Sequence, residues 1–183
     1  MKIQKLFINL SRISGLFNIN TRPVFMRVIP NKEFIENVDQ LLSEGKSVEL
    51  RCLGSSMQPY LRGDGSEVIV ASPFSPDELI PGAIVLFHYR GKYICHRVVK
   101  REEEKLMIQG DGVIKRQEQV LLSDVVGIIR IIIRRSKKPV STQTKAAQWY
   151  WRCWRRLSPV RRPLLLGYRL ALKIIRFCYP SKS

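Results

Sequence analysis

The chain is poor in residues that would indicate a metal centre or a membrane span. It has two histidines and four cysteines in 183 residues, without a C-x-x-C pair or a His and Cys cluster of zinc-site spacing, so no metal or other cofactor is expected. No segment offers the roughly 20 apolar residues that cross a bilayer. Residues 6–17 are too short and lack a secretory cleavage site. The expected location is cytoplasmic, either free or peripheral to the inner face of the membrane.

The cysteines are expected to be free, buried thiols that fill strand positions as small apolar residues. They are Cys52, Cys95, Cys153 and Cys178. Because Cys52 and Cys95 lie close in sequence to Ser56 and His96, a regulatory disulfide between these two is the alternative.

Acidic residues are missing from both ends of the chain. Residues 26–133 hold 14 Lys or Arg and 15 Asp or Glu, whereas residues 1–25 and 134–183 are basic and contain no acid. The formal net charge of +17 therefore belongs to the ends, and an anionic partner should meet the tail. We expect a basic extension at 1–25, with a natural start at Met26 as the alternative, a β domain at 26–138 and a basic, Trp-rich amphipathic tail at 139–183.

The central region is predicted to be mainly β. Apolar residues at helical spacing predict a helix that begins near Asn31 and ends at Gly45. Short β-rich runs separated by Gly, Pro and Asp follow, at 48–53, 67–71, 83–90, 93–100, 105–109 and 120–133. The turn at 90–92 predicts a hairpin. So many short runs favour a compact, coiled antiparallel sheet or small barrel, with one N-terminal helix and a basic C-terminal helical tail.

The tail combines aromatic and basic residues. Trp149, Trp151 and Trp154 lie among arginines, and a second apolar segment at 164–179 carries one stripe of cations: Arg162, Arg169, Lys173 and Arg176. This composition is typical of a helix that lies in a membrane surface. Docking onto the domain or onto a second subunit is the alternative. Nucleic acid is an unlikely partner, because no recognisable nucleic-acid-binding fold accompanies the Trp and Arg residues.

Ser56 and His96 are the strongest candidates for chemistry. Ser56 lies in the segment GSSMQP (54–59) and His96 in YICHRVV (93–99). A serine hydroxyl needs a nearby base to become a nucleophile, and histidine titrates close to physiological pH. Alternation along the strand places His96 on the face of Ile94 and Val98, as expected for a partly buried imidazole. The other histidine, His88, is expected to be structural.

Six ordered sequence blocks place these two residues in a wider pattern. They are G-x-S-M-x-P at 54–59, LRGD at 61–64, PGAIV at 81–85, HRVV at 96–99, QGDG at 109–112 and DVVG at 124–127. In this order they resemble the signal-peptidase-like serine peptidases, in the branch that has histidine where many relatives have lysine. The resemblance implies a signal-peptidase type of coiled β fold, with Ser56 as nucleophile, His96 as general base and the Ser56 backbone N–H as an oxyanion donor.

The third catalytic position departs from the family pattern. The resemblance implies Asp111 as the carboxylate that orients the imidazole, with Asp124 or a backbone carbonyl as alternatives. A further family aspartate falls on Gln117, with Glu118 beside it, and the hydroxyl that some relatives carry two residues before the nucleophile is Gly54. The implied function is a serine endopeptidase that cleaves a leader- or signal-like peptide through an acyl-enzyme. The alternative is a catalytically weak or inactive peptide-binding or membrane-associated scaffold.

Overall fold

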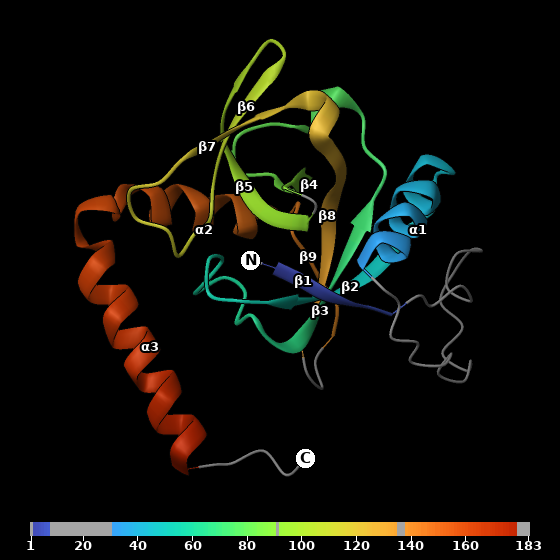
Figure 1. The fold of residues 1–183 in the computed structure, drawn as a ribbon. Coiled ribbons are helices and arrows are strands. Elements are labelled where there is room, and N and C mark those ends of the chain that lie inside the picture. Colours follow the sequence, from blue (N-terminus) through green and yellow to red (C-terminus); the bar gives the residue numbers. More distant parts are fainter. Residues whose placement is uncertain (1, 8–30, 91, 135–137, 179–183) are drawn as a thin grey trace.

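The described part of the chain is built on one twisted antiparallel sheet (Figure 1). The computed structural model describes residues 2–7, 31–90, 92–134 and 138–178. Within these residues, eight strands follow one another in the order β1-β2-β3-β8-β4-β5-β6-β7, and β9 pairs with β8. The strands are β1 (Lys2–Phe7), β2 (Val48–Leu53), β3 (Asp64–Ser72), β4 (Ile84–Tyr89), β5 (Lys92–Glu102), β6 (Lys105–Gln109), β7 (Glu118–Leu121), β8 (Val125–Ile133) and β9 (Val140–Ser141).

The prediction of a mainly β, antiparallel fold is confirmed, but the sheet is not a closed barrel. Strands β1 and β5 approach each other through one residue pair, Lys2 with Ile94, rather than through a continuous ladder. The predicted hairpin is present, because β4 and β5 pair from Tyr89 with Lys92 back to Ile84 with Arg97. Strand β1 was not expected from the sequence. The rest of the predicted extension, 8–25, and the alternative start at Met26 lie outside the described residues.

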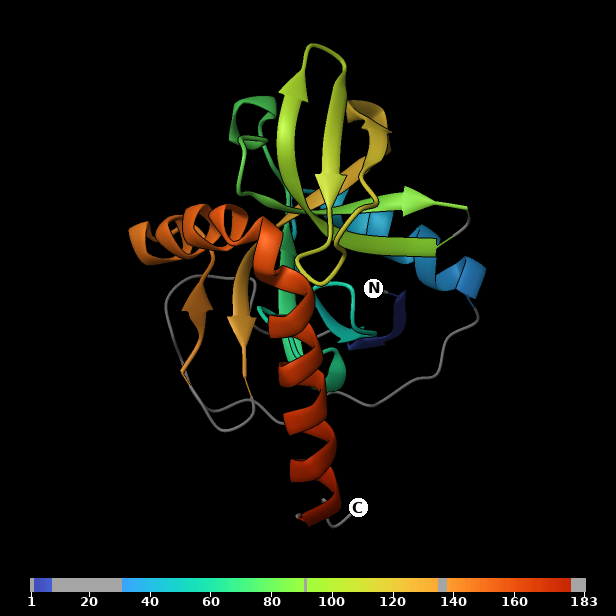
Figure 2. The ribbon, with the colours of Figure 1, turned by 90° about the vertical axis from the view of Figure 1, so that its left-hand side faces the viewer.

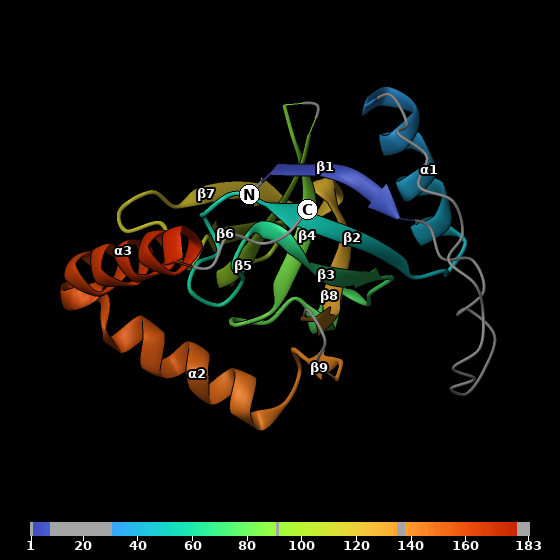
Figure 3. The same cartoon turned by 90° about the horizontal axis from the view of Figure 1, so that it is seen from below.

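Three α-helices flank the sheet within the described residues. They are α1 (Asn31–Ser43), α2 (Lys145–Arg156) and α3 (Arg161–Cys178), and short 3-10 turns occur as η2 (Pro76–Glu78), η3 (Leu122–Asp124) and η4 (Ser158–Val160). Helix α1 lies at one side of the sheet and α2 and α3 lie at the other (Figures 1 and 3). The predicted first helix is confirmed: it ends just before Gly45, whose φ of 80° suits glycine.

Two apolar clusters fill the core. One packs α1 against the strands through Val38, Leu42 and residues of β2, β3 and β8, and it includes Met57 from the segment after β2. The other gathers β4, β5, β6 and β7 around Phe87, Val98 and Ile108. Burial alternates along β2, so that every second side chain enters the core. The core therefore holds one face of β2, the strand that precedes Ser56. Met57, the neighbour of Ser56, is fully buried.

Helix α2 docks onto the domain. Thr144 caps its first turn by accepting a hydrogen bond from the backbone N–H of Ala147. Trp151 and Trp154 are buried, whereas Trp149 is 69% exposed. A side chain at Gly82 would lie 2.8 Å from the Trp151 ring, so the tight contact there depends on glycine. The docking interpretation of the tail is therefore right for α2. Helix α3 continues past the sheet, and its C-terminal half extends beyond it (Figure 2).

Candidate active site

Ser56 lies in the turn segment 54–63 between β2 and β3. The backbone N–H of Gly54 donates to the carbonyl of Gly63 at 2.8 Å, and both glycines have positive φ. A Cβ on Gly63 would lie 1.7 Å from the Gly54 carbonyl oxygen, so the two ends of the turn meet only because this residue is glycine. Within the turn, Met57 points into the core and anchors the backbone next to Ser56.

His96 reaches Ser56 from β5. Its Nε2 atom lies 3.0 Å from Ser56 Oγ, and only 6% of the residue is exposed. The two residues are separated by forty positions in sequence, and the pairing of β5 with β4 and β6 fixes the strand that carries the imidazole. The structure therefore brings the two predicted site residues together at hydrogen-bond distance.

The carboxylate beside His96 is Glu118. Its Oε2 atom lies 3.0 Å from His96 Nδ1, and its side chain is 15% exposed. Glu118 begins β7 and pairs with Ile108 of β6. Because side chains alternate along a strand, Glu118 shares the inward face of Val120. That alternation was the signal in the sequence that could have identified Glu118.

The prediction that Asp111 orients His96 is corrected by the structure. Both carboxylate oxygens of Asp111 bind Arg97 instead, at 2.9 Å from Nε and 2.8 Å from Nη2. The two side chains are each only 1% exposed, so this is a buried, bidentate ion pair. Although burial opposes the charged guanidinium, Asp111 raises the pKa of Arg97 above its ordinary value. The alternative residue, Asp124, lies in η3.

Comparisons of the chain with protein-family models, with curated proteins and with solved structures found no match. The support for chemistry at this site is the geometry of Ser56, His96 and Glu118.

The segment 110–112 packs directly against the turn that carries Ser56. The N–H of Gly112 donates to the carbonyl of Ser56 at 2.8 Å. A Cβ on Gly110 would lie 2.2 Å from the Ser56 carbonyl oxygen, and a Cβ on Gly112 would lie 2.5 Å from that of Ser55. Both glycines are therefore required for the close approach of two backbone segments. Asp111 stands between them and ties the same segment to Arg97.

The C-terminal helices also hold this segment. Trp154 Nε1 donates to the carbonyl of Asp111 at 2.9 Å, and Arg169 Nη2 donates to the carbonyl of Gly112 at 3.2 Å. Arg169 Nε also lies 3.4 Å from Gln58 Oε1, two residues after Ser56. Helices α2 and α3 thus contact both segments that form the site. Sequence patterns do not predict these contacts, because they join residues more than forty positions apart.

The charge state of His96 is set by opposing influences. Burial lowers the pKa of His96 to about 3, and the positive charge of Arg116 acts in the same direction. The carboxylate of Glu118 acts oppositely, because a negative charge at 3.0 Å stabilises an imidazolium. Burial is the larger influence and the net shift of the pKa is downward, so the imidazole is neutral at neutral pH and can accept a proton. Once it has accepted one, Glu118 is in place to stabilise the charge.

The second histidine has the structural contacts expected of it. His88 Nε2 lies 2.9 Å from Asp39 Oδ2, and Tyr93 OH donates to Asp39 Oδ1 at 2.7 Å. Burial, with a further contribution from Asp39, raises the pKa of Tyr93. Since Asp39 lies on α1 and the other two residues lie on β4 and β5, this cluster fixes the helix to the sheet.

The cysteines divide into two pairs by environment. Cys52 and Cys95 are free and buried as predicted, and burial together with a hydrogen bond to Cys95 raises the pKa of Cys52 well above its ordinary value. Raised pKa values make thiols unreactive. The prediction of buried strand positions is wrong for the other two cysteines: Cys153 lies on α2 and is partly exposed, and Cys178 lies on α3 and is exposed.

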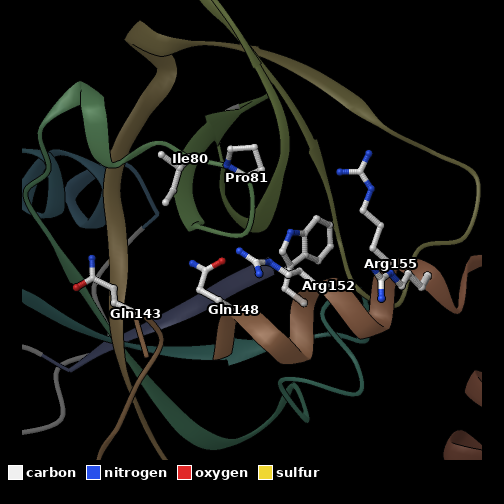
Figure 4. Close-up of a pocket in the computed structure, with 8 residues that line it drawn as sticks. Ile80, Pro81, Gln143, Gln148, Arg152 and Arg155 are labelled. Carbon is white, nitrogen blue, oxygen red and sulfur yellow. The ribbon is translucent and has the colours of Figure 1, made fainter. Parts of the chain in front are cut away.

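A pocket of about 750 Å³ lies away from these residues, between α2 and the segment before β4. Figure 4 shows Arg152 and Arg155 on α2, with Ile80 and Pro81 across from them. The lining includes none of Ser56, His96 and Glu118, so the candidate chemistry is not in this pocket. In the part of the chain that the structure describes, His, Cys, Asp and Glu side chains form no group of three that could hold a metal ion.

Proposed function

We propose that the chain is a serine endopeptidase of the signal-peptidase-like group, with Ser56 as nucleophile, His96 as general base and Glu118 as the residue that orients and stabilises the imidazole. The observation that supports this proposal is a pair of contacts of 3.0 Å each, from Ser56 Oγ to His96 Nε2 and from His96 Nδ1 to Glu118 Oε2. This order of hydroxyl, imidazole and carboxylate is the arrangement that activates serine in unrelated hydrolases.

The tautomer of His96 follows from its two contacts. A carboxylate accepts hydrogen bonds, so Nδ1 carries the proton and donates a hydrogen bond to Glu118 Oε2. Nε2 is then the acceptor that faces the Ser56 hydroxyl. A neutral imidazole in this tautomer is the form that a general base needs, and burial keeps His96 neutral by lowering its pKa.

The proposed reaction has two stages. Ser56 Oγ attacks the carbonyl carbon of the scissile peptide bond while His96 Nε2 takes the hydroxyl proton, and a tetrahedral intermediate forms. His96 then gives this proton to the departing amine nitrogen, the C–N bond breaks and an acyl-enzyme remains. In the second stage water attacks the acyl carbon while His96 takes a proton from it. The ester C–O bond to Ser56 then breaks, His96 returns the proton to Ser56 Oγ, and the acyl part leaves as a carboxylic acid. Ser56 is released as the free hydroxyl.

The proposed substrate is a leader- or signal-like peptide. An extended peptide can bind to a β protein by backbone hydrogen bonds as an additional strand, which needs no conspicuous side-chain motif. The support for a peptide over another acyl substrate is the sequence resemblance in the six blocks between 54 and 127, together with the mainly β antiparallel fold.

The test compares alanine variants with a serine-reactive fluorophosphonate probe and with candidate leader peptides. Ser56→Ala and His96→Ala should abolish labelling and cleavage. Ser55→Ala is the matched control for the nucleophile because it removes the adjacent hydroxyl, and His88→Ala is the control for the base. Both controls should retain activity.

Two results would contradict the proposal. If Ser56→Ala is labelled or cleaves at the wild-type rate, Ser56 is not the nucleophile. If the folded wild type is neither labelled nor active on any leader peptide, the proposed peptidase activity is wrong, and the alternative of a peptide-binding or membrane-associated scaffold is favoured.

A further inference from the structure

The outer face of α3 is apolar although it points away from the domain. Helix α3 rests on the protein through one row of residues, in which Leu165 and Arg161 are buried and Tyr168 is half-buried. The opposite row consists of Leu166, Leu170 and Ile174, which are 72%, 59% and 54% exposed. We call these three residues the outer face of α3. Contiguous exposed apolar surface of this kind marks an interaction site.

The outer face of α3 is bordered by cations on one side and by aliphatic residues on the other. Along one side run the cations Arg162, Arg169 and Lys173, at offsets of seven and four that place them on one stripe. Along the other side lie further exposed aliphatic residues, Leu164 and Ile175. From Lys145 to Cys178 the sequence contains no acidic residue. The helix thus offers apolar surface and positive charge together, without a negative group.

We propose that the outer face of α3 binds an anionic membrane surface, with the helix lying in the plane of the bilayer. An apolar face can enter the boundary between headgroups and acyl chains by about 5–10 Å while adjacent cations contact lipid phosphates. The helix has 18 residues, and no described helix of the chain is long and apolar enough to cross a bilayer. Lying in the surface is therefore the arrangement that matches both its length and its charge.

A second copy of the chain fits this surface less well. Symmetric pairing of two outer faces would bring the same cationic stripe of each copy close to the other, with no acid on either helix to compensate. The formal net charge of +17 adds repulsion between copies. Nucleic acid would satisfy the cations but would leave Leu166, Leu170 and Ile174 against a charged backbone. Anionic lipid can contact the apolar residues with its acyl chains and the cations with its phosphates.

Membrane binding would also position the candidate active site. Arg169, on the stripe beside the outer face, contacts Gln58 and Gly112, and both belong to the segments that surround Ser56. An α-helix with its side chains is about 10–12 Å across. The turn that carries Ser56 would therefore lie about one helix diameter from the lipid surface.

The test is sedimentation of the full chain with lipid vesicles. Neutral phosphatidylcholine vesicles are compared with vesicles that contain anionic phosphatidylglycerol, each at low and at physiological salt. Wild type should sediment with the anionic vesicles, and more so at low salt. The outer-face variant, Leu166→Gln with Leu170→Gln and Ile174→Gln, should bind at least about ten-fold more weakly, because three apolar side chains no longer enter the lipid.

Matched variants separate the contributions of apolar surface and charge. The control for the outer-face variant changes three exposed apolar residues elsewhere and should bind as wild type does. It combines Ile80→Gln, Leu121→Gln and Val140→Gln. Arg162→Gln with Lys173→Gln should weaken binding to anionic vesicles, whereas Lys92→Gln with Lys105→Gln should not. All these side chains are exposed, so the variants should keep the thermal midpoint of the wild type.

Three results would overturn the proposal. One is that wild type fails to sediment with anionic vesicles at low salt. Another is that the outer-face variant binds as tightly as wild type, which would mean adsorption by charge alone. The third is a concentration-dependent dimer in analytical ultracentrifugation that the outer-face variant abolishes, without vesicle binding. Since sedimentation does not require catalysis, its outcome is independent of the proposed peptidase activity.

Discussion

Exchanging the two carboxylates for amides separates the roles of Glu118 and Asp111. Glu118→Gln keeps the size of the side chain but replaces an acceptor by a group that can also donate to His96 Nδ1. A donated hydrogen bond there favours the tautomer with the proton on Nε2, which cannot accept the Ser56 proton. We expect the rate of labelling by the serine-reactive probe to fall by about 10²–10⁴-fold. The free energy of unfolding should change by less than about 1 kcal/mol.

Asp111→Asn should act mainly on stability. It leaves the Arg97 guanidinium, 1% exposed, without the carboxylate that binds it in two places. Breaking a buried ion pair on one side costs about 3–5 kcal/mol. For a domain of this size each kcal/mol lowers the melting temperature by about 2–4 °C, so a decrease of about 6–20 °C is expected. Arg97 still donates to the Gly82 carbonyl and lies 4.6 Å from the Tyr60 ring centroid, so it keeps some of its surroundings.

The two assays are thermal unfolding and probe labelling well below the melting temperature of each variant. If Asp111→Asn does not fold, the double variant Arg97→Met with Asp111→Asn serves instead, because it removes both charges and should recover part of the lost stability. The reasoning is refuted if Asp111→Asn melts like wild type and is not labelled while Glu118→Gln is labelled at the wild-type rate. That result would restore Asp111 as the residue that orients the imidazole.

Three further predictions concern pH, backbone contact and the tail. Because only neutral His96 accepts a proton and burial holds its pKa below the ordinary value of 6.5, the acid limb of the labelling rate should lie below pH 6.5; Arg116→Gln removes a positive charge and should move this limb to higher pH. Gly112→Ala should lower the labelling rate at least about ten-fold, since its Cβ would lie 2.5 Å from the Ser55 carbonyl oxygen, whereas Gly167→Ala enters open space and should have no effect. Trp154→Phe leaves the Asp111 carbonyl without its donor and should destabilise the fold by about 1–3 kcal/mol in thermal unfolding; the exposed Trp149→Phe should not.

Local patterns in the sequence were sufficient to predict the elements that depend on periodic burial and on turn residues. The helix at 31–43, the hairpin of β4 and β5, and the mainly β character depend on residues near one another in the chain, and the structure agrees with them. Strand β1 was missed because its partners, β2 and β5, lie far away in sequence. Sequence alone does not decide whether α2 docks, because a Trp-rich amphipathic helix can bind lipid or protein equally well.

The sequence by itself determined which residues were chemically capable: the serines of a glycine-bounded turn, from which the family resemblance selects Ser56, and a histidine on a partly apolar strand, His96. Tertiary structure decided how they are combined. Asp111 and Glu118 are both inward-facing carboxylates. Residue type alone does not tell which of them contacts His96, since either could bind a cationic or donating side chain. Strand register placed Arg97 against Asp111 and His96 against Glu118, on opposite faces of β5. Because alternate side chains of a strand point to opposite faces, adjacent residues reached different carboxylates.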